Sequence, residues 1–260
     1  RAPRLSDPRT FNEKMLWLNL RTRDPRRVVC ADKFAVRDWV AERIGDDYLV
    51  PLLGAYDTTA DIRLDALPDA FVVKATHASG WNLIVRDKRE LDWERTRRKL
   101  DRWLAGNYYH QYRERHYREI QPRLVVEQLL LDEHGDIPED YKLLCMAGAD
   151  VTTILVQVDV DRFENHRRNF FDLDWERLPF ELEYPPFEGS IGRPERLEEM
   201  VDVARRLAEG FPFVRVDLYG IGERVYFGEL TFTPEAANGR FRPEEWDLGL
   251  GELIELPVRR

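Results

Sequence analysis

Apolar residues recur at helical spacing along the first 45 residues of the chain. Thr10 and Glu13 match the Ser/Thr-x-x-Glu pattern that caps a helix N-terminus, and a mostly apolar run follows them. A second run with helical spacing extends over 32–44, and Gly45 after it is suited to end a helix. The pattern therefore predicts two helices at the N-terminus.

Short apolar runs typical of strands dominate the rest of the chain. They predict strands over 48–53, 71–75, 83–85, 123–131, 141–147 and 151–158, and a hairpin formed by 213–219 and 225–231. Amphipathic patterns predict two further helices, over 92–105 and 194–209. Strands and helices without a regular β-α-β alternation indicate an α+β fold with two lobes.

The predicted hairpin carries charged residues on strands that are otherwise apolar. Alternate residues of a strand share a face, so Arg215 lies beside Asp217 on the first strand. Glu229 and Thr231 share a face of the second strand, and Tyr226 is expected on its opposite, apolar face. If the hairpin closes symmetrically around its turn, Asp217 faces Glu229 and the apolar faces of both strands coincide.

Two carboxylates in that position repel each other unless something offsets their charge. Arg215, a shared proton or a bound cation would each do so. The oxygens of Asp217, Glu229 and Thr231 suit a hard divalent ion such as Mg²⁺. The alternative is a surface cluster of salt bridges, but the many aromatic residues around the hairpin favour a site shielded from water.

Three lysines stand at positions where a cation is unexpected. Lys74 interrupts an apolar strand, and the Ser79-Gly80 loop after it can lay backbone N–H groups over phosphate oxygens. The alternative is an edge-strand lysine that points to water. Lys142 begins another apolar strand. Lys33 lies at a predicted helix start, where a cation opposes the helix dipole, and this suggests a bound anion nearby.

Glu127 is a carboxylate within the apolar strand predicted over 123–131. The strand backbone just after such a residue can form hydrogen bonds with the edge of an adenine. The alternative is a carboxylate on an edge strand, and the residue alone does not decide between the two.

The order of these residues along the chain resembles the ATP-grasp superfamily. More closely, it resembles the TupA-like ATP-grasp family, which is linked to the synthesis of teichuronopeptide and other cell-surface polysaccharides. The segments that carry the resemblance span nearly the whole chain: 11–14, 32–33, 73–80, 126–127, 140–142, 215–219 and 226–234. The last two are the most specific.

The resemblance implies an α+β ATP-grasp fold, in which two lobes built on antiparallel sheets hold ATP between them. The expected division is an N-terminal helical and strand segment at 1–68, a small lobe with the phosphate loop at 69–140, and a catalytic lobe with the metal-binding hairpin at 141–260. ATP and Mg²⁺ are the implied cofactors.

The resemblance also implies which residues bind the nucleotide. They are Lys33, Lys74, His77, Ser79, Gly80, Glu127, Gln128, Leu129 and Lys142. Within this set, lysines contact the phosphates, the loop closes over them, and the backbone after the glutamate holds the adenine.

The implied metal ligands are Asp217 and Glu229, with Thr231 in a position where related ligases often have Asn. A hydroxyl there either ligates the metal or orients a metal-bound water. Arg215 and Lys74 are the implied catalytic residues, and Arg215 would stabilise the transferring phosphoryl group.

By resemblance, the protein is an ATP-dependent carboxylate–amine ligase. Such enzymes activate a carboxylate as an acyl phosphate, which an amine then attacks. The link to surface polysaccharides suggests a uronic-acid carboxylate and an amino acid or other amine as substrates. It also suggests a cytoplasmic enzyme that meets the inner face of the membrane through its substrate.

The substrate pocket is expected in two less regular stretches, 161–193 and 235–247. The first contains arginine and aromatic residues that either hold a carboxylate sugar or serve as ordinary surface and packing residues. They are Arg162, Arg167, Arg168, Phe170, Phe171 and Trp175.

Two other functions are alternatives. Asp159-Val160-Asp161 is an Asp-x-Asp triplet, which some glycosyltransferases use to hold a divalent ion, although the expected nucleotide-binding α/β unit before it is not evident. The second alternative is a non-catalytic ATP-grasp module that binds a nucleotide or sugar without turnover. The complete set of charged site residues argues against it.

Composition restricts the function further. The 260 residues include 40 Lys and Arg against 49 Asp and Glu, and the net charge of −9 argues against nucleic-acid binding. Apolar runs are too short to span a membrane. Cys30 and Cys145 are expected to be buried reduced thiols, and the five histidines lack metal-site spacing. The chain does not begin with Met and is expected to be a fragment.

Two arginine-rich stretches, 21–27 and 95–102, stand out in this acidic chain. Such runs are usually the solvated faces of helices. The alternative is a local patch for an anionic ligand.

Overall fold

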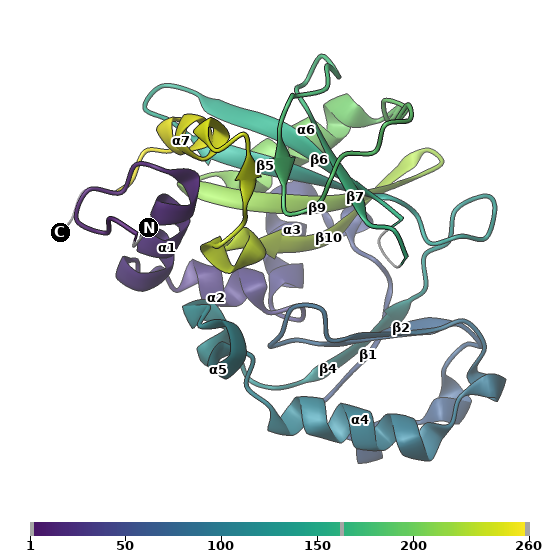
Figure 1. Ribbon diagram of the computed structural model, residues 1–260. Coiled ribbons are helices and arrows are strands. Elements are labelled where there is room, and N and C mark those ends of the chain that lie inside the picture. The colour runs from purple at the N-terminus through teal and green to yellow at the C-terminus, as the bar shows by residue number, and fades with distance from the viewer. Residues whose placement is uncertain (1–2, 162–163, 258–260) are drawn as a thin grey trace. The chain divides into compact units, whose positions relative to one another are not determined.

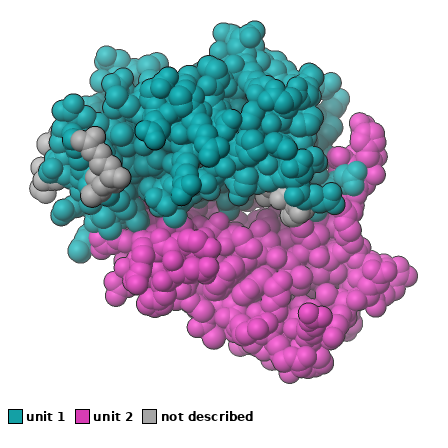
Figure 2. Space-filling model, viewed as in Figure 1, with its two compact units in different colours: residues 1–23, 136–260 teal, residues 24–135 magenta. Residues whose placement is uncertain are grey.

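The computed structural model describes residues 3–161 and 164–257. The chain forms two compact units, which Figure 2 shows in different colours. Unit 1 consists of residues 1–23 and 136–260, and unit 2 of residues 24–135.

These units differ from the division expected after residues 68 and 140. The chain up to residue 23 belongs with the C-terminal part, because helix α1 (Phe11–Arg21) packs against helix α7 (Glu245–Glu252). This contact joins residues more than 200 positions apart, so no local pattern in the sequence indicates it.

Unit 1 is built on a five-stranded antiparallel sheet with the strand order β10-β9-β5-β6-β7 (Figure 1). Its strands are β5 (Asp140–Ala147), β6 (Thr152–Val160), β7 (Arg167–Phe171), β9 (Phe213–Ile221) and β10 (Arg224–Thr231).

The two faces of this sheet bury different cores. Helix α6 (Leu197–Ala208) packs against β5 and β9, where the Cys145 thiol contacts the Ala204 carbonyl. On the opposite face, Leu144 and Met146 join the apolar core that contains α1 and α7. Because side chains alternate along β5, Lys142 lies on that same opposite face, beyond the apolar core.

Unit 2 contains a four-stranded antiparallel sheet with the order β1-β4-β2-β3. Its strands are β1 (Leu52–Tyr56), β2 (Phe71–Ala75), β3 (Asn82–Val85) and β4 (Leu124–Gln128). Helix α4 (Trp93–Ala105) covers one face, where Leu100 packs with Val73 and Val126. Lys74, next to Val73 on β2, therefore points to the other face.

Shorter elements complete the chain. The helices are α2 (Arg26–Ala31), α3 (Val36–Ile44) and α5 (Tyr109–Tyr112), and the two-stranded sheet pairs β8 (Glu181–Leu182) with β11 (Phe241–Arg242). The 3₁₀ turns are η1 (Asp46–Tyr48), η2 (Thr59–Asp61), η3 (Leu64–Ala66), η4 (Lys88–Glu90), η5 (Arg115–Arg118) and η6 (Pro234–Ala237).

The predicted capping box is confirmed: the Glu13 backbone N–H donates to Thr10 Oγ1 over 3.2 Å, and Glu13 Oε2 accepts from the Thr10 N–H over 3.3 Å. The helix expected from residue 32 begins at Val36, because the Asp32 carboxylate accepts from backbone N–H groups in the preceding turn. The strand expected over 48–53 begins later, as β1 at Leu52, because residue 48 belongs to the 3₁₀ turn η1.

Candidate active site

The β9–β10 hairpin has a two-residue turn at 222–223 and a β-bulge at Gly228. Beyond the bulge, Asp217 pairs with Glu229. The predicted opposition of these carboxylates is confirmed, but it does not arise from symmetric closure. The turn is one residue nearer to Asp217 than to Glu229 along the chain, and the extra residue of the bulge, Gly228, makes up the difference. A Cβ at Gly228 would lie 2.9 Å from the Asp217 carbonyl oxygen, so glycine permits this close approach.

The bulge reverses the alternation of side chains along β10. Tyr226 pairs with Tyr219, on the face that carries Asp217, and Phe227 is buried on the other side. The prediction that Tyr226 belongs to the apolar face is therefore wrong.

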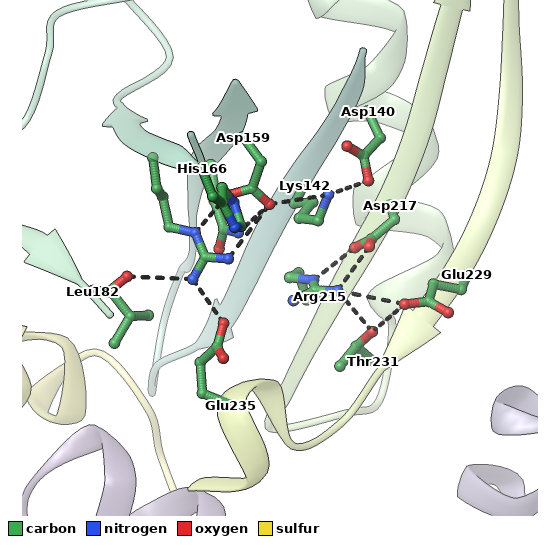
Figure 3. Close-up of polar contacts among 12 residues, drawn as sticks. Asp140, Lys142, Asp159, His166, Leu182, Arg215, Asp217, Glu229, Thr231 and Glu235 are labelled. Atoms are coloured by element: carbon green, nitrogen blue, oxygen red, sulfur yellow. Dashed lines mark hydrogen bonds and ion pairs between the residues drawn. The ribbon is translucent and has the colours of Figure 1, made fainter. Parts of the chain in front are cut away.

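Arg215 offsets the charge of the two carboxylates (Figure 3). Its Nε and Nη2 atoms donate to the two oxygens of Asp217, each over 2.7 Å, and Nη2 lies 3.5 Å from Glu229 Oε1. Nη2 also donates to Thr231 Oγ1 over 3.1 Å, and that hydroxyl donates to Glu229 Oε1 over 3.2 Å. Arg215 and the three predicted metal ligands therefore form one hydrogen-bonded group.

Burial shapes the protonation of this group. It raises the pKa of Asp217 to about 6, against the pull of the Arg215 and Lys142 cations and with the help of Glu229. Burial opposes the Arg215 cation too, but the neighbouring carboxylates outweigh it and raise the pKa of the guanidinium. At neutral pH Asp217 is ionised, so it can act as a ligand.

The donor set fits a magnesium ion that arrives with a nucleotide. Asp217 and Glu229 offer hard carboxylate oxygens and Thr231 a hydroxyl. Within residues 3–161 and 164–257, no group of three or more His, Cys, Asp or Glu side chains could hold a metal ion. Mg²⁺ commonly takes one or two carboxylates and completes its shell with phosphate oxygens and water, so two carboxylates suffice.

Lys142 extends the group onto the next strand. It pairs with Asp217 across β5 and β9 and is buried. Its ammonium contacts Asp140 Oδ2 and lies 3.4 Å from Asp159 Oδ2. The structure thus brings Lys142 and the hairpin residues together on one face of the sheet.

Asp159, which the sequence suggested only as half of an Asp-x-Asp triplet, is a buried hub of this face. It lies 2.6 Å from Arg168 Nε and 3.1 Å from His166 Nε2, besides its contact with Lys142. Burial opposes its charge, but Arg168 and Lys142 hold the pKa of Asp159 well below its usual range. Asp161 is exposed beyond the end of β6, so the triplet does not present two carboxylates to one metal.

The residues expected in the substrate pocket divide in the structure. Phe170 and Phe171 are buried, and the Phe171 ring stacks on Trp175 at 4.4 Å, so these three are packing residues. Arg168 also donates to Glu235 Oε1 over 2.7 Å. Arg167 is half-buried on β7, and Arg162 lies outside the described residues.

In unit 2, Lys74 forms an ion pair instead of pointing into water. Its Nζ atom lies 2.7 Å from Glu127 Oε2, and the Lys74 side chain is 18% exposed. Arg37 of α3 holds the other oxygen of Glu127 at 3.0 Å and donates to the Val50 carbonyl over 2.9 Å. Sequence reasoning missed Arg37, whose partner lies 90 positions away.

The loop after β2 is anchored at its base. His77 is buried, and its Nε2 atom lies 2.9 Å from the Trp103 carbonyl oxygen, while the Lys33 ammonium donates to the Ala78 carbonyl over 2.6 Å. Burial lowers the pKa of His77 and favours the neutral ring. Lys33 and His77 therefore hold the loop backbone.

The tip of the same loop is accessible. Ser79 is half-buried, and Gly80 is exposed with a φ of 71°, in the left-handed region that suits glycine. Ser79 and Gly80 are thus accessible, whereas the base of the loop is buried.

The predicted adenine-binding segment begins at the last residue of β4. Glu127 is buried, and the Gln128 N–H donates to the Pro51 carbonyl over 3.0 Å. Leu129 lies just beyond the end of the strand. Its backbone is therefore placed where the sheet no longer continues.

The model of the TupA-like ATPgrasp family matches residues 13–255, nearly the whole chain. The chain belongs to this family. The resemblance inferred from the sequence is thereby confirmed. No curated protein matches the sequence significantly.

One solved structure supports the fold. The D-alanine–D-alanine ligase from Helicobacter pylori superposes with a TM-score of 0.53 at 13% identity, covering 97% of this chain and 68% of that one. This likeness shows the α+β ATP-grasp fold, as predicted. Two further matches are N5-carboxyaminoimidazole ribonucleotide synthetase from Thermus thermophilus (TM-score 0.44, 13% identity, 78% and 45% coverage) and the Bacillus anthracis D-alanine–D-alanine ligase (0.47, 17%, 86% and 65%). The chain spans about half the length of that synthetase and two thirds of the ligases.

Proposed function

We propose that the protein is an ATP-dependent carboxylate–amine ligase that works through an acyl phosphate. The observation that carries the proposal is the hydrogen-bonded group of Arg215, Asp217, Glu229 and Thr231, with Lys142 beside it. Family membership and the ATP-grasp fold support the same activity. Phosphorylation of a carboxylate needs neutralisation of phosphate charge rather than a protein nucleophile, and this group supplies cations and hard oxygen ligands.

Each residue has a role in the proposed reaction. Asp217 and Glu229 would hold Mg²⁺, with Thr231 as a ligand or through a water, and the bound ion would neutralise phosphate charge of the nucleotide. Arg215 and Lys142 stabilise the charge of the transferring phosphoryl group. Nucleotide-binding roles are also proposed for these residues of unit 2: Lys33, Lys74, His77, Ser79, Gly80, Glu127, Gln128 and Leu129.

In this proposal Lys33 and His77 act indirectly, by holding the loop backbone, and Lys74 contributes while it is paired with Glu127.

The proposed reaction has two steps. In the first step a substrate carboxylate oxygen attacks the γ-phosphorus and ADP leaves. In the second, the amine attacks the acyl carbon, inorganic phosphate leaves and the amine loses a proton. In each step one bond to the γ-phosphorus or the acyl carbon forms as another breaks.

A uronic-acid carboxylate on a cell-surface polymer and an amino acid or other amine are the proposed substrates, and the proposed location is the cytoplasm. The family's link to surface polysaccharides supports both. A panel of uronic acids and amines tests the proposal by release of ADP and phosphate. We expect release to require one member of each class, and Glu229→Gln to abolish it without unfolding the protein. Turnover of a nucleotide-sugar, without ADP release, would instead establish the glycosyltransferase alternative.

A further inference from the structure

Helix α4 exposes a row of arginines. Arg95, Arg98 and Arg102 follow the i, i+3, i+7 spacing that places residues on one face of a helix, over about 10 Å. All three are exposed, whereas Leu100 on the other side of the helix is buried against the sheet. Figure 1 shows α4 along one side of the unit 2 sheet. The row therefore faces away from the core of its unit.

These arginines are not neutralised within the part of the chain that the structure describes. Arg102 donates its Nε to the Arg98 carbonyl over 3.3 Å, and none of the three guanidinium groups has an acidic partner among residues 3–161 and 164–257. The nearby Glu94 lies 3.8 Å from a different arginine, Arg97. The row keeps its full positive charge toward solvent.

The surrounding segment is basic in an acidic protein. Between residues 93 and 118, eight Lys and Arg stand against three Asp and Glu, although the whole chain has a net charge of −9. Trp93 and Trp103 of α4 are half-buried and pack against the core of the unit, so the exposed arginine row does not include them. Clusters of Lys and Arg on one face of a helix are typical of surfaces that bind anionic phospholipid headgroups.

We propose that the exposed face of α4 docks on an anionic phospholipid surface. The apolar side of α4 is committed to the core, so the contact is electrostatic and shallow, without insertion of the helix. Within the described residues no helix is both apolar and long enough to span a bilayer, so this contact would be peripheral. A straight row of cations on the exposed face of a helix suits a flat anionic surface better than a single polymer chain, which a groove would enclose.

The test is sedimentation with vesicles. The full chain is mixed with phosphatidylcholine vesicles that contain about 30 mol% phosphatidylserine, at about 0.05 M and about 0.3 M salt. Binding is expected at low salt, and weaker binding at high salt. Each basic residue near such a surface contributes about fivefold to binding, so Arg95→Glu/Arg98→Glu should weaken it at least about 25-fold.

The matched control is Arg205→Glu/Arg206→Glu on α6, an amphipathic helix of similar length with two exposed arginines in its last turn. It changes the net charge equally and should retain most of the binding. Circular dichroism checks that both variants are folded, and neither should lose ATP binding. The proposal is overturned if the wild type does not bind anionic vesicles or binds neutral vesicles equally well. It is also overturned if the two double variants lose binding to the same extent. Binding to soluble polygalacturonate without binding to vesicles would also overturn it. None of these outcomes depends on the ligase activity.

Discussion

Asp217 and Asp159 are buried carboxylates on neighbouring parts of one sheet face, and their surroundings shift their pKa values in opposite directions. Asp217 shares Arg215 with Glu229, and burial raises its pKa to about 6. Asp159 is surrounded by cations that outweigh burial and lower its pKa. A raised carboxyl pKa means that the charge costs stability in the fold, and a lowered one means that it contributes.

Asn in place of each carboxylate should therefore have opposite effects on stability at neutral pH. Asp217→Asn is expected to leave the melting temperature unchanged or slightly raised. Asp159→Asn should lower the free energy of unfolding by about 3 kcal/mol, because buried Arg168 and Lys142 lose their partner. Calorimetry of the metal-free variants measures both, and equal losses would contradict the assignment. Asp217→Asn should also abolish ADP release, since a metal ligand is lost.

Asp217 further predicts a pH dependence. Its folded pKa of about 6 lies above that of an unfolded aspartate, so its contribution to stability grows as the pH falls from about 6 to about 4. The same protonation removes a ligand for Mg²⁺. Affinity for an unreactive ATP analogue with Mg²⁺ should therefore fall steeply below about pH 6. Calorimetric titrations compare the wild type with Asp217→Asn, which should bind weakly throughout. A flat wild-type profile between about pH 5 and 7 would refute the role of Asp217.

Among the elements, the loop after β2 combines an anchored base with an accessible tip. The backbone of 76–78 should exchange its amide hydrogens slowly, because it is buried, and that of 79–82 faster. Lys33→Met removes the ammonium that holds the Ala78 carbonyl, so exchange at 76–78 should accelerate while the sheet stays protected. Lys88→Met is the control, because Lys88 makes a comparable contact with the Leu67 carbonyl elsewhere in unit 2. If both variants exchange alike at 76–78, Lys33 does not hold the loop.

The hairpin illustrates how far patterns in the sequence reach. Alternation of charged and apolar residues predicts one charged face, because side chains alternate along a strand. The pairing of Asp217 with Glu229 rests on symmetric closure around the turn, and it occurs in the structure only because the bulge compensates for the position of the turn. The bulge at Gly228 was not predicted, since a single inserted residue leaves no periodic signal. Tyr226 was therefore assigned to the wrong face. The role of Arg37 is not predictable from a local pattern for another reason: its contact with Glu127 joins segments far apart in the sequence.

For the whole molecule, the fold says less about the reaction than the residues of the candidate site do. ATP-grasp proteins share one architecture across different substrates, so the fold alone does not select a carboxylate or an amine. In the proposed mechanism, three features bind the nucleotide or its metal ion: the hydrogen-bonded group on the hairpin, the loop after β2, and the ion pair of Lys74 with Glu127. Nucleotide choice is therefore the part of the function that can be tested before any substrate is known.

ATP with Mg²⁺ should stabilise the folded protein. A ligand at about 100 times its dissociation constant adds about 2.7 kcal/mol to the free energy of unfolding, which corresponds to a rise in melting temperature of about 5–10 °C for a chain of this size. ATP without Mg²⁺ should give a smaller rise, and Asp217→Asn should lose the part that depends on the metal. A UDP-sugar with Mn²⁺ should not raise the melting temperature. The Asp159 carboxylate already forms ion pairs with Arg168 and Lys142, and Asp161 lies beyond the end of β6. Stabilisation by the UDP-sugar but not by ATP would reject the ligase in favour of a glycosyltransferase.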